Sequence, residues 1–298
     1  MAHHNQATMT GYICDNIRFV RNRETKEVTS ATVTLMTARR DIEGCPESRF
    51  GEVLVIAQEK EILEKLLKCR KFDIISIKGV FDVMPHMAAV QCPHCGQITY
   101  VQKTTTFIYP LSLIKLGSVA KEHDLALLND NAGAKDTRVS PEAVIDKNYR
   151  EISNQVILVG TVISEPTLKN VTTKRGENLQ SCLYTVGVDR KYLIRSQTDT
   201  KADYPWICSY GTQAYRDARH ILPSDEGQGT LVLIDGFFAQ KEVVKTNECE
   251  NCHSKFRFKD IGTRFIPYSI EYLNRYRTDE DIAREDELKE QSKNGSFM

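Results

Sequence analysis

Hydrophobic and polar residues alternate in short stretches along most of the chain, a pattern that predicts strands more often than helices. In the C-terminal half, four such stretches are rich in β-branched and aromatic residues and are bounded by turn residues. They are Gln155–Ile163, Cys182–Val188, Trp206–Tyr210 and Thr230–Phe238. A helical pattern, Gln213–Leu222, lies between the third and the fourth stretch. The chain is therefore expected to be mostly β, with one helix inserted late in this group of strands.

The N-terminal half repeats this order of elements. Gly79 and Gly236 each lie in an apolar stretch, and a Cys-x-x-Cys pair begins thirteen residues after each glycine, at Cys92 and at Cys249. The two copies are offset by 157 residues at all of these landmarks. A strand-like and a helical stretch precede the glycine in the first copy as well, at Glu52–Ala57 and Lys60–Leu67. This matched spacing favours an internal repeat over chance similarity between β-rich segments.

Five strands with a helix between strands three and four is the order of an OB-fold barrel, so the repeat predicts two tandem barrels. Each barrel is expected to carry a Cys-x-x-Cys knuckle between strands four and five. We place the first unit at residues 1–118, with its knuckle at 92–95, and the second at residues 154–275, with its knuckle at 249–252. Residues 119–153, rich in turn formers, are expected to form a linker with a short helix around Val119–Leu128. Residues 276–298 are expected to form an acidic C-terminal helix or tail.

Three segments of the second unit resemble bacterial single-stranded DNA-binding proteins. Asn154–Pro166 is similar to the opening strand of that family, Tyr204–Gly211 to its third strand and Gly229–Gly236 to its fourth. The resemblance covers Asn154–Phe238 and implies an OB fold that binds single-stranded DNA. That family has one barrel per chain and no cysteine knuckle, so two chains of two barrels here would match its four-barrel assembly, and a homo-oligomer is expected.

The resemblance also implies which rings stack on bases. Tyr204 takes the position of the family's stacking tryptophan, and Tyr210 that of its phenylalanine. Trp206 shares their face by strand alternation. We expect Tyr204 and Trp206 to be exposed, whereas Tyr210 fits stacking and core packing equally well. Another stacking position falls close to a cluster of one ring and three cations, which are Tyr192, Arg190, Lys191 and Arg195.

The first unit offers a weaker DNA-binding face. Phe50 corresponds to Tyr204, but Glu52 corresponds to Trp206, and a carboxylate there repels phosphate. The second unit is therefore expected to carry more of the affinity, while the first contributes Phe50 and several arginines or mediates assembly. These arginines, which fit an ordinary solvated face nearly as well, are Arg18, Arg21, Arg23, Arg39 and Arg40.

The two Cys-x-x-Cys pairs predict a structural zinc site. Structural zinc takes four ligands in a tetrahedron, and each unit offers only two thiolates. The simplest arrangement brings Cys92, Cys95, Cys249 and Cys252 together around one ion that clamps the two units. Two alternatives stay open: each pair recruits another chain's pair or a nearby histidine, or the cysteines hold no metal. The nearby histidines are His86, His94 and His253.

The chain carries 40 basic and 40 acidic residues and is neutral overall. Residues 279–298 contain seven acidic and three basic residues, a charge of −4, which leaves +4 on residues 1–278. A mildly basic body with an acidic tail is compatible with a DNA binder that relies partly on stacking. The tail fits a solvated helix best, with docking of replication or recombination proteins as the alternative.

Other features narrow the class of protein. No apolar run approaches the roughly 20 residues of a membrane helix, and the N-terminus lacks an apolar signal core. We therefore expect a cytoplasmic protein without membrane contact. We find no Walker loop, His-Glu-x-x-His motif or clustered carboxylates, so we expect no enzymatic activity. The predicted function is binding of single-stranded DNA in replication, recombination or the transfer of a phage or other mobile element, with RNA as an alternative ligand. The competing hypothesis is an OB-fold adaptor that binds protein partners in a replication or transcription complex.

Overall fold

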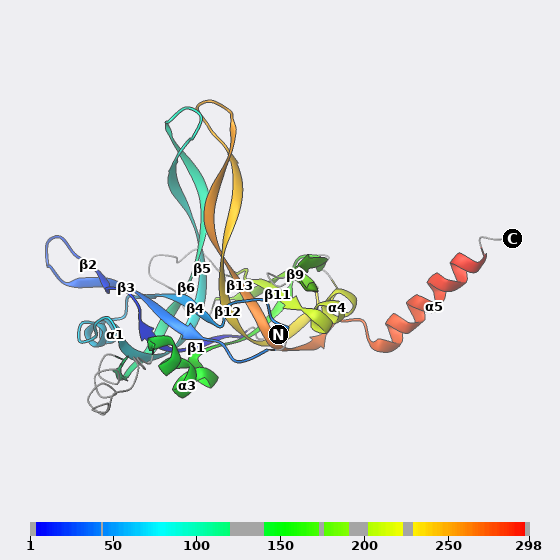
Figure 1. Cartoon of the computed structure of the whole chain (residues 1–298), viewed down its shortest axis with the longest axis horizontal. Coiled ribbons are helices and arrows are strands. Elements are labelled where there is room, and N and C mark those ends of the chain that lie inside the picture. The colour runs from blue at the N-terminus through cyan, green and yellow to red at the C-terminus, as the bar shows by residue number, and fades with distance from the viewer. Residues whose placement is uncertain are drawn as a thin grey trace, which may run out of the picture.

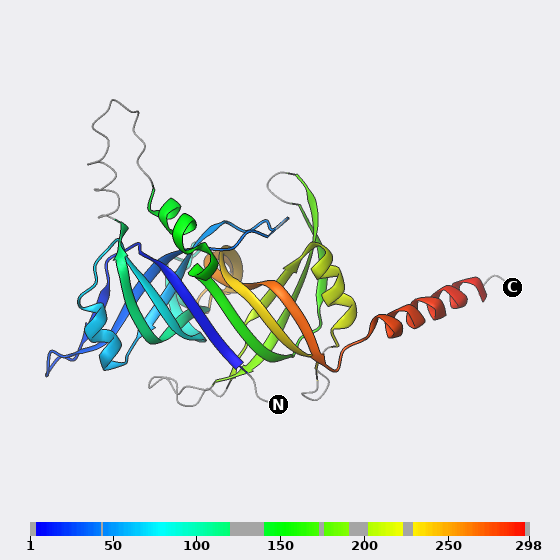
Figure 2. The same cartoon turned by 90° about the horizontal axis from the view of Figure 1, so that it is seen from below.

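A computed structural model describes residues 4–42, 44–119, 140–172, 176–190, 202–222 and 229–295. The prediction of a mostly β chain is confirmed: thirteen strands form one extended hydrogen-bonded network in the described part. The four strands predicted for the C-terminal half are all present. Figures 1 and 2 show the strands gathered in two adjacent groups.

Five strands of the N-terminal half pair in a closed circuit, which we call the first ring. Their bounds are β1 His4–Ile13, β3 Val28–Ala38, β4 Phe50–Ala57, β5 Asp73–Gln91 and β6 Ile98–Ser118. The pairings run β1–β3–β4–β6–β5 and return to β1; only the β4–β6 pairing is parallel. A further strand, β2 Arg18–Arg21, extends β3 outward as a hairpin.

The second ring repeats this circuit with β7 Asn154–Val162, β9 Asn178–Asp189, β11 Trp206–Tyr210, β12 Leu231–Glu248 and β13 Lys255–Asn274. The pairings run β7–β9–β11–β13–β12 and return to β7, with β11–β13 parallel. Two additional strands, β8 Thr167–Thr172 and β10 Ala202–Asp203, pair with β9. The sequence analysis missed both of them.

The two rings are joined along β1 and β7, which pair antiparallel from His4↔Val159 to Met9↔Asn154 (Figure 2). Phe81 of the first ring packs against Phe238 and Phe265 of the second, at ring-centroid distances of 5.8 and 5.1 Å. A single buried apolar cluster consequently runs through both rings. The rings are held together by a shared core as well as by a shared sheet.

The described helices of four or more residues are α1 Lys60–Leu66, α3 Pro141–Ser153, α4 Gly211–His220 and α5 Asp279–Gly295. None of them is long and apolar enough to cross a membrane. The helix expected around Val119–Leu128 lies outside the described residues except for Val119. Instead, the end of the expected linker forms α3, whose N-terminus is capped by the Ser140 hydroxyl, which accepts a hydrogen bond from the Ala143 amide.

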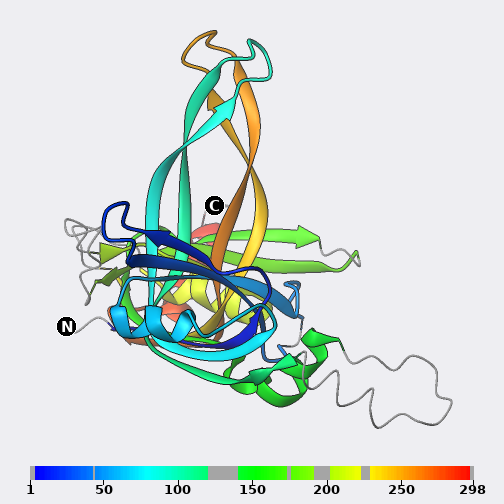
Figure 3. The same cartoon turned by 90° about the vertical axis from the view of Figure 1, so that its left-hand side faces the viewer.

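Strands β5, β6, β12 and β13 are much longer than the rings require, because their distal halves leave the rings as two hairpins. We call residues 82–106 the first arm and residues 239–263 the second arm. The arms lie side by side and project away from the rings (Figures 1 and 3). A small apolar core fills the space between them, including Val101, Phe256 and Phe258. The turns at the two tips contain the two Cys-x-x-Cys pairs.

Gly79 and Gly236 occupy matched positions at the base of the arms, where the register of each hairpin shifts. A Cβ atom would lie 2.2 Å from the Tyr109 carbonyl oxygen at Gly79 and 2.4 Å from the Ile266 carbonyl oxygen at Gly236. These distances are shorter than any side chain tolerates, so both positions require glycine. The residues in contact, Tyr109 and Ile266, are themselves 157 positions apart.

Candidate nucleic-acid interface and metal centre

A cleft of about 600 Å³ opens between the second ring and the bases of both arms. One wall is the segment from Ala202 to Trp206, and the other is formed by the arm bases, including Val83, Thr104 and Thr263. The cleft therefore exists only because the arms emerge beside β11. Its position was not predicted, because the sequence analysis did not identify the arms.

Tyr204 and Trp206 line this cleft, and their side chains are 53% and 49% exposed. The exposure expected for these two rings is therefore found. Pro205 separates them, and its carbonyl oxygen accepts a hydrogen bond from the Val186 amide, so the turn is tied to β9. From Trp206 onward the chain pairs regularly with β9. The two rings thus project from an ordered backbone.

Two cationic side chains, Lys245 and Arg264, also line the cleft. The Lys245 ammonium pairs with Asp260 at 2.6 Å, so part of its charge is balanced within the protein. Hydroxyl groups from Thr104, Thr106 and Thr263 add hydrogen-bonding capacity. The sequence analysis did not select any of these residues as DNA contacts. The alternation of Lys255 to Ile261, with Phe256 and Phe258 inward, is the signal that predicts a continuous arm there.

A second cleft, of about 510 Å³, lies at the matching place against the first ring. Its wall carries Glu52 and Leu54 of β4, and Glu242 and Asp260 of the second arm also line it, together with Lys103 and Lys259. Among the described residues, the only ring that lines this cleft is the imidazole of His86, and no Phe, Tyr or Trp side chain does so. The asymmetry expected from Glu52 thus extends to the whole lining, and only the cleft on the second ring combines exposed Tyr and Trp rings with cations.

Tyr210 does not join Tyr204 and Trp206 in the cleft. It is half-buried, and its hydroxyl donates to Glu47 at 2.5 Å, while burial raises its pKa above the ordinary value. Glu47 belongs to the loop of residues 39–49, which reaches from the first ring onto the second and packs Ile42 and Cys45 beside Tyr210. This loop covers the end of the predicted face that carries Tyr210, and leaves open the end that carries Tyr204 and Trp206.

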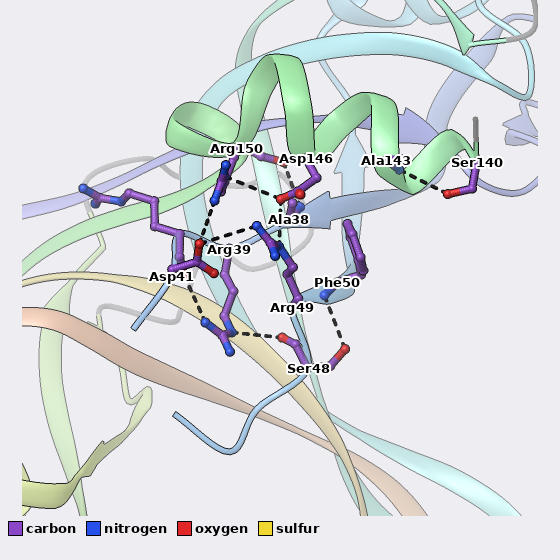
Figure 4. Close-up of polar contacts among 12 residues, drawn as sticks. Ala38, Arg39, Asp41, Ser48, Arg49, Phe50, Ser140, Ala143, Asp146 and Arg150 are labelled. Carbon is purple, nitrogen blue, oxygen red and sulfur yellow. Dashed lines mark hydrogen bonds and ion pairs between the residues drawn. The ribbon is translucent and has the colours of Figure 1, made fainter. Parts of the chain in front are cut away.

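Arg39 and Arg40 anchor the same loop. Arg39 is 8% exposed, and its guanidinium donates to the carbonyl oxygens of residues 40, 47 and 48. Figure 4 shows the bond to Ser48. Arg40 pairs with Asp235 at 3.0 Å and stacks over Tyr268 at 4.0 Å. Arg39 also lies over the ring of Phe237 in the second ring, at 5.6 Å from its centroid, so both arginines join the two rings. The burial of Arg39 and the pairing of Arg40 argue against the phosphate contacts expected for them.

Phe50 is also placed away from both clefts. It packs under α3 with Tyr12, Ala38 and Ile145, and Figure 4 shows it beneath that helix. Its correspondence to Tyr204 in the sequence is therefore not matched by its surroundings. The other three arginines expected on the DNA-binding face of the first unit, Arg18, Arg21 and Arg23, are exposed on the β2–β3 hairpin.

Arg190 is placed next to the cleft but is buried, with a side chain that is 3% exposed. It forms ion pairs with Asp82 and Asp203 and does not line the cleft. These surroundings argue against the expected contact between Arg190 and phosphate, because the guanidinium is already paired with two carboxylates. Tyr192, Lys191 and Arg195 lie outside the described residues.

The four cysteines of the two tips meet in one cluster. Their sulfur atoms all lie within 4.8 Å of one another; Cys92 Sγ is 3.8 Å from Cys252 Sγ, and Cys95 Sγ is 3.7 Å from Cys249 Sγ. Disulfide bonds require about 2.05 Å, so these thiols are not bonded to each other. Backbone amides of Cys252 and Asn251 lower the pKa of Cys249 to about 6.

This geometry fits a tetrahedral metal ion. With zinc–sulfur bonds of about 2.3 Å, the sulfurs of a regular tetrahedron lie about 3.8 Å apart. Among the described residues, no histidine belongs to the cluster, and His94 and His253 are exposed beside it. The arrangement in which both pairs share one site is therefore the one found, and neither a histidine nor another chain is needed to complete four ligands.

The fold was compared with solved structures. The wild-type single-stranded DNA-binding protein from Thermus aquaticus superposes with a TM-score of 0.53 at 13% identity, over 94% of this chain and 97% of that chain. The chain shares the fold of this protein. A deletion mutant of the same Thermus aquaticus protein gives a TM-score of 0.51 at 12% identity, over 94% of this chain and 98% of that chain. The likeness thus spans both rings and concerns the fold alone.

Sequence comparisons add nothing to this result. No protein-family model matches the chain, and no curated protein matches it by sequence.

Proposed function

We propose that this chain is a single-stranded DNA-binding protein made of two tandem OB-fold barrels, with the cleft on the second ring as its main binding site. The observation that carries the proposal is the pair of half-exposed rings, Tyr204 and Trp206, on one wall of that cleft. Flat rings at a cleft bind unpaired bases by stacking, and each stacked base contributes about 1–3 kcal/mol. Duplex DNA keeps its bases stacked on one another, so such a site selects single strands.

The tandem-barrel part of the proposal is supported by the strand pairings. Each ring has five strands, a helix before its fourth strand and a single parallel pairing, as OB folds do. Residues 1–118 and 154–275 would form the two barrels, residues 119–153 their linker and residues 276–298 an acidic tail. The Thermus aquaticus structures, which are described as single-stranded DNA-binding proteins, support the same function.

The phosphate-contacting groups come from the arm bases. Arg264 and Lys245 provide positive charge beside the two rings, and the threonine hydroxyls provide neutral hydrogen bonds. Since Asp260 balances Lys245, few net charges meet the DNA. We therefore expect a weak dependence of affinity on salt compared with binders that neutralise many phosphates.

We further propose that Cys92, Cys95, Cys249 and Cys252 hold one structural zinc ion that fixes the arms together. Four thiolates complete a tetrahedron and leave no open position, so the ion would supply structure and no catalysis. The arms matter for binding because their bases form a wall of the cleft.

The cellular role follows from the ligand. A single-strand binder serves replication, recombination or mobile-element transfer, in a phage or in a cell, and we propose this group of processes in the cytoplasm. The acidic helix α5 is the segment that would dock replication or recombination proteins. RNA is a second ligand to test, because stacking does not depend on the sugar.

The test is a titration of the full chain with oligo-dT, oligo-rU and duplex DNA at several salt concentrations. Trp206 is the only tryptophan, so its fluorescence reports on the cleft directly. We expect stoichiometric quenching by oligo-dT and little response to duplex. Unchanged fluorescence together with no binding of a labelled oligo-dT would refute the proposal.

A second candidate function, an OB-fold adaptor for protein partners, rests on the outer face of the first arm. Met87, Ile98 and Tyr100 are 60%, 64% and 54% exposed there. The matching positions of the second arm are Val244, Lys255 and Arg257, so two of the three exposed apolar side chains are replaced by cations there. If oligo-dT does not bind while a protein partner is retained through Tyr100, the adaptor is the better description.

A further inference from the structure

We propose that Arg190 is a positioning residue for the cleft: it holds Asp203 against the base of the first arm and thereby fixes where Tyr204 stands. The effect of Arg190 on DNA binding rests on the proposed function, whereas its positioning of Tyr204 can be tested in the chain without DNA. It replaces the direct contact with phosphate that the sequence predicts for this arginine.

The guanidinium of Arg190 forms two hydrogen bonds with the carboxylate of Asp203. Arg190 Nε lies 3.0 Å from Asp203 Oδ2, and Arg190 Nη2 lies 2.5 Å from Asp203 Oδ1. The same Nη2 also contacts Asp82 Oδ1. A planar fork that meets a carboxylate at two points fixes orientation as well as distance, which lysine cannot do.

The three side chains are closed off from solvent. Those of Arg190, Asp82 and Asp203 are 3%, 1% and 1% exposed. A phosphate could reach the guanidinium only after an ion pair had broken and left a buried carboxylate alone, which is costly. The burial therefore separates Arg190 from the ligand, although the three residues lie directly behind the cleft.

Among the described residues, the segment that they hold has few other backbone supports. Strand β10 has two residues, which pair with Asp189 and Val188 of β9, and the Pro205 carbonyl accepts a hydrogen bond from the Val186 amide. Asp203 Oδ1 additionally accepts a hydrogen bond from the Val83 amide at 2.9 Å. Asp203 thus links β10 to the base of the first arm, and Tyr204 is the next residue in the chain.

The hydrogen bond from the Val83 amide to Asp203 therefore connects the two walls of the cleft. Val83 and Asp203 belong to opposite walls, and both line the cleft next to Tyr204. Without the link, the two walls separate and the ring at position 204 loses its fixed orientation. Stacking depends on that orientation, so affinity falls even though no DNA contact has been removed.

The decisive variant is Asp203→Ala, because the two roles of Arg190 predict opposite changes. If Arg190 contacts phosphate, removal of a neighbouring carboxylate frees a cation and tightens binding. If Arg190 acts through Asp203, the same variant weakens binding of oligo-dT by about tenfold, the loss of one stacked base. Glu165→Ala, which removes an exposed carboxylate of the same ring, is the matched control and leaves affinity within about twofold.

A second measurement follows position 204 without DNA. In a reporter chain that combines Tyr204→Trp with Trp206→Phe, the single tryptophan is read by fluorescence anisotropy and acrylamide quenching. At pH 8.5, where Asp82 is ionised, we expect Asp203→Ala to lower the anisotropy and raise the quenching in this reporter, and Asp82→Asn to do so to a smaller extent. Urea unfolding of each variant identifies any that fail to fold, and Asp82→Asn, which keeps the shape of the side chain, then carries the test.

Tighter binding by Asp203→Ala, or a reporter that does not change in either variant, overturns the proposal. Failure of the parent chain to bind oligo-dT refutes the proposed function instead, and the reporter still tests the positioning role of Arg190.

Discussion

Asn154 forms two hydrogen bonds with the backbone of Phe238: its side-chain amide donates to the carbonyl oxygen at 3.0 Å, and its side-chain oxygen accepts from the amide at 3.0 Å. Asn5 makes the same pair of bonds with Phe81, at 2.8 and 3.0 Å. In each case the side chain continues the ladder where the backbone of its own strand has turned to pair across the rings. Directly after Phe81 and Phe238, the long strands leave the rings as arms.

Replacement of this asparagine is expected to destabilise the chain. Asn154→Ala leaves a buried N–H and a buried carbonyl of Phe238 without partners, and each orphaned group costs about 1–3 kcal/mol. The free energy of unfolding should fall by about 2 kcal/mol or more, as measured by urea denaturation. Asn5→Ala should cost a similar amount.

Asn170, exposed on β8, is the matched control for this experiment. Asn170→Ala should change the free energy of unfolding by no more than about 0.5 kcal/mol. Equal losses for Asn154→Ala and Asn170→Ala would show that the two bonds to Phe238 do not support the base of the arm.

The pattern of hydrophobic and polar residues within short segments was enough to predict several strands and helices. Short alternating stretches marked β7, β9 and β11, and the helices α1 and α4 followed from their apolar spacing. The two Cys-x-x-Cys pairs, with the four ligands that structural zinc takes, predicted a shared four-thiolate cluster, which the structure brings together. Ser140 followed by Pro141 is a helix start signal that was assigned to the linker.

The roles of the arginines predicted to contact DNA depend on partners that are distant in the sequence. Arg190 beside Tyr192 fits a basic DNA-binding loop, but Asp82 and Asp203, distant from each other in sequence, enclose the guanidinium. Arg40 likewise pairs with Asp235, and Arg39 lies over the ring of Phe237; both partners are brought near only by the fold. A cation's partners depend on long-range contacts, so its type and neighbours in the sequence could not distinguish a ligand contact from an internal one.

The aromatic pair of the cleft should account for much of the affinity. Tyr204→Ala removes one stacking surface without a buried polar group, so the fold should persist while the dissociation constant for oligo-dT rises about 10- to 100-fold. A labelled oligo-dT followed by anisotropy measures this without relying on Trp206 fluorescence.

Tyr100→Ala is the comparison, since Tyr100 is equally exposed but lies on the outer face of the first arm. It should leave affinity for oligo-dT unchanged. If both variants lose the same affinity, the cleft is not the principal binding site.

Loss of the metal site should loosen the arms before the rings. The arm core contains few apolar residues, whereas the rings share a large buried cluster. The purified chain should contain about one zinc ion per chain. Cys252→Ser should lower this content and open residues 84–104 and 242–261 to limited proteolysis, while the far-UV circular dichroism of the rings changes little.

Cys69→Ser changes a thiol that lies outside the cluster, close to α1, and should retain the full zinc content. A full zinc content in Cys252→Ser, or arms that resist the protease after chelation, would contradict a structural role for the ion.

Asp82 should make stability depend on pH. Burial, followed by the neighbouring charge of Asp203, raises the pKa of Asp82 from 3.8 to about 7, while Arg190 acts in the opposite direction. The native state therefore keeps a proton on Asp82 at pH values where the unfolded chain has lost it. Stability from this group is highest below about pH 4 and declines as the pH rises towards 7.

Asp82→Asn isolates this contribution, because the amide is uncharged at every pH and other titrating groups cancel in the comparison. Between pH 4 and 8 the free energy of unfolding of the wild-type chain should fall relative to that of Asp82→Asn, and the difference should level off above about pH 7. Urea denaturation at closely spaced pH values measures it. Parallel curves for the two chains would mean that Asp82 has its ordinary pKa in the native state, with Arg190 offsetting both burial and Asp203. A wild-type curve that rises relative to the variant would mean that the pKa of Asp82 lies below its ordinary value.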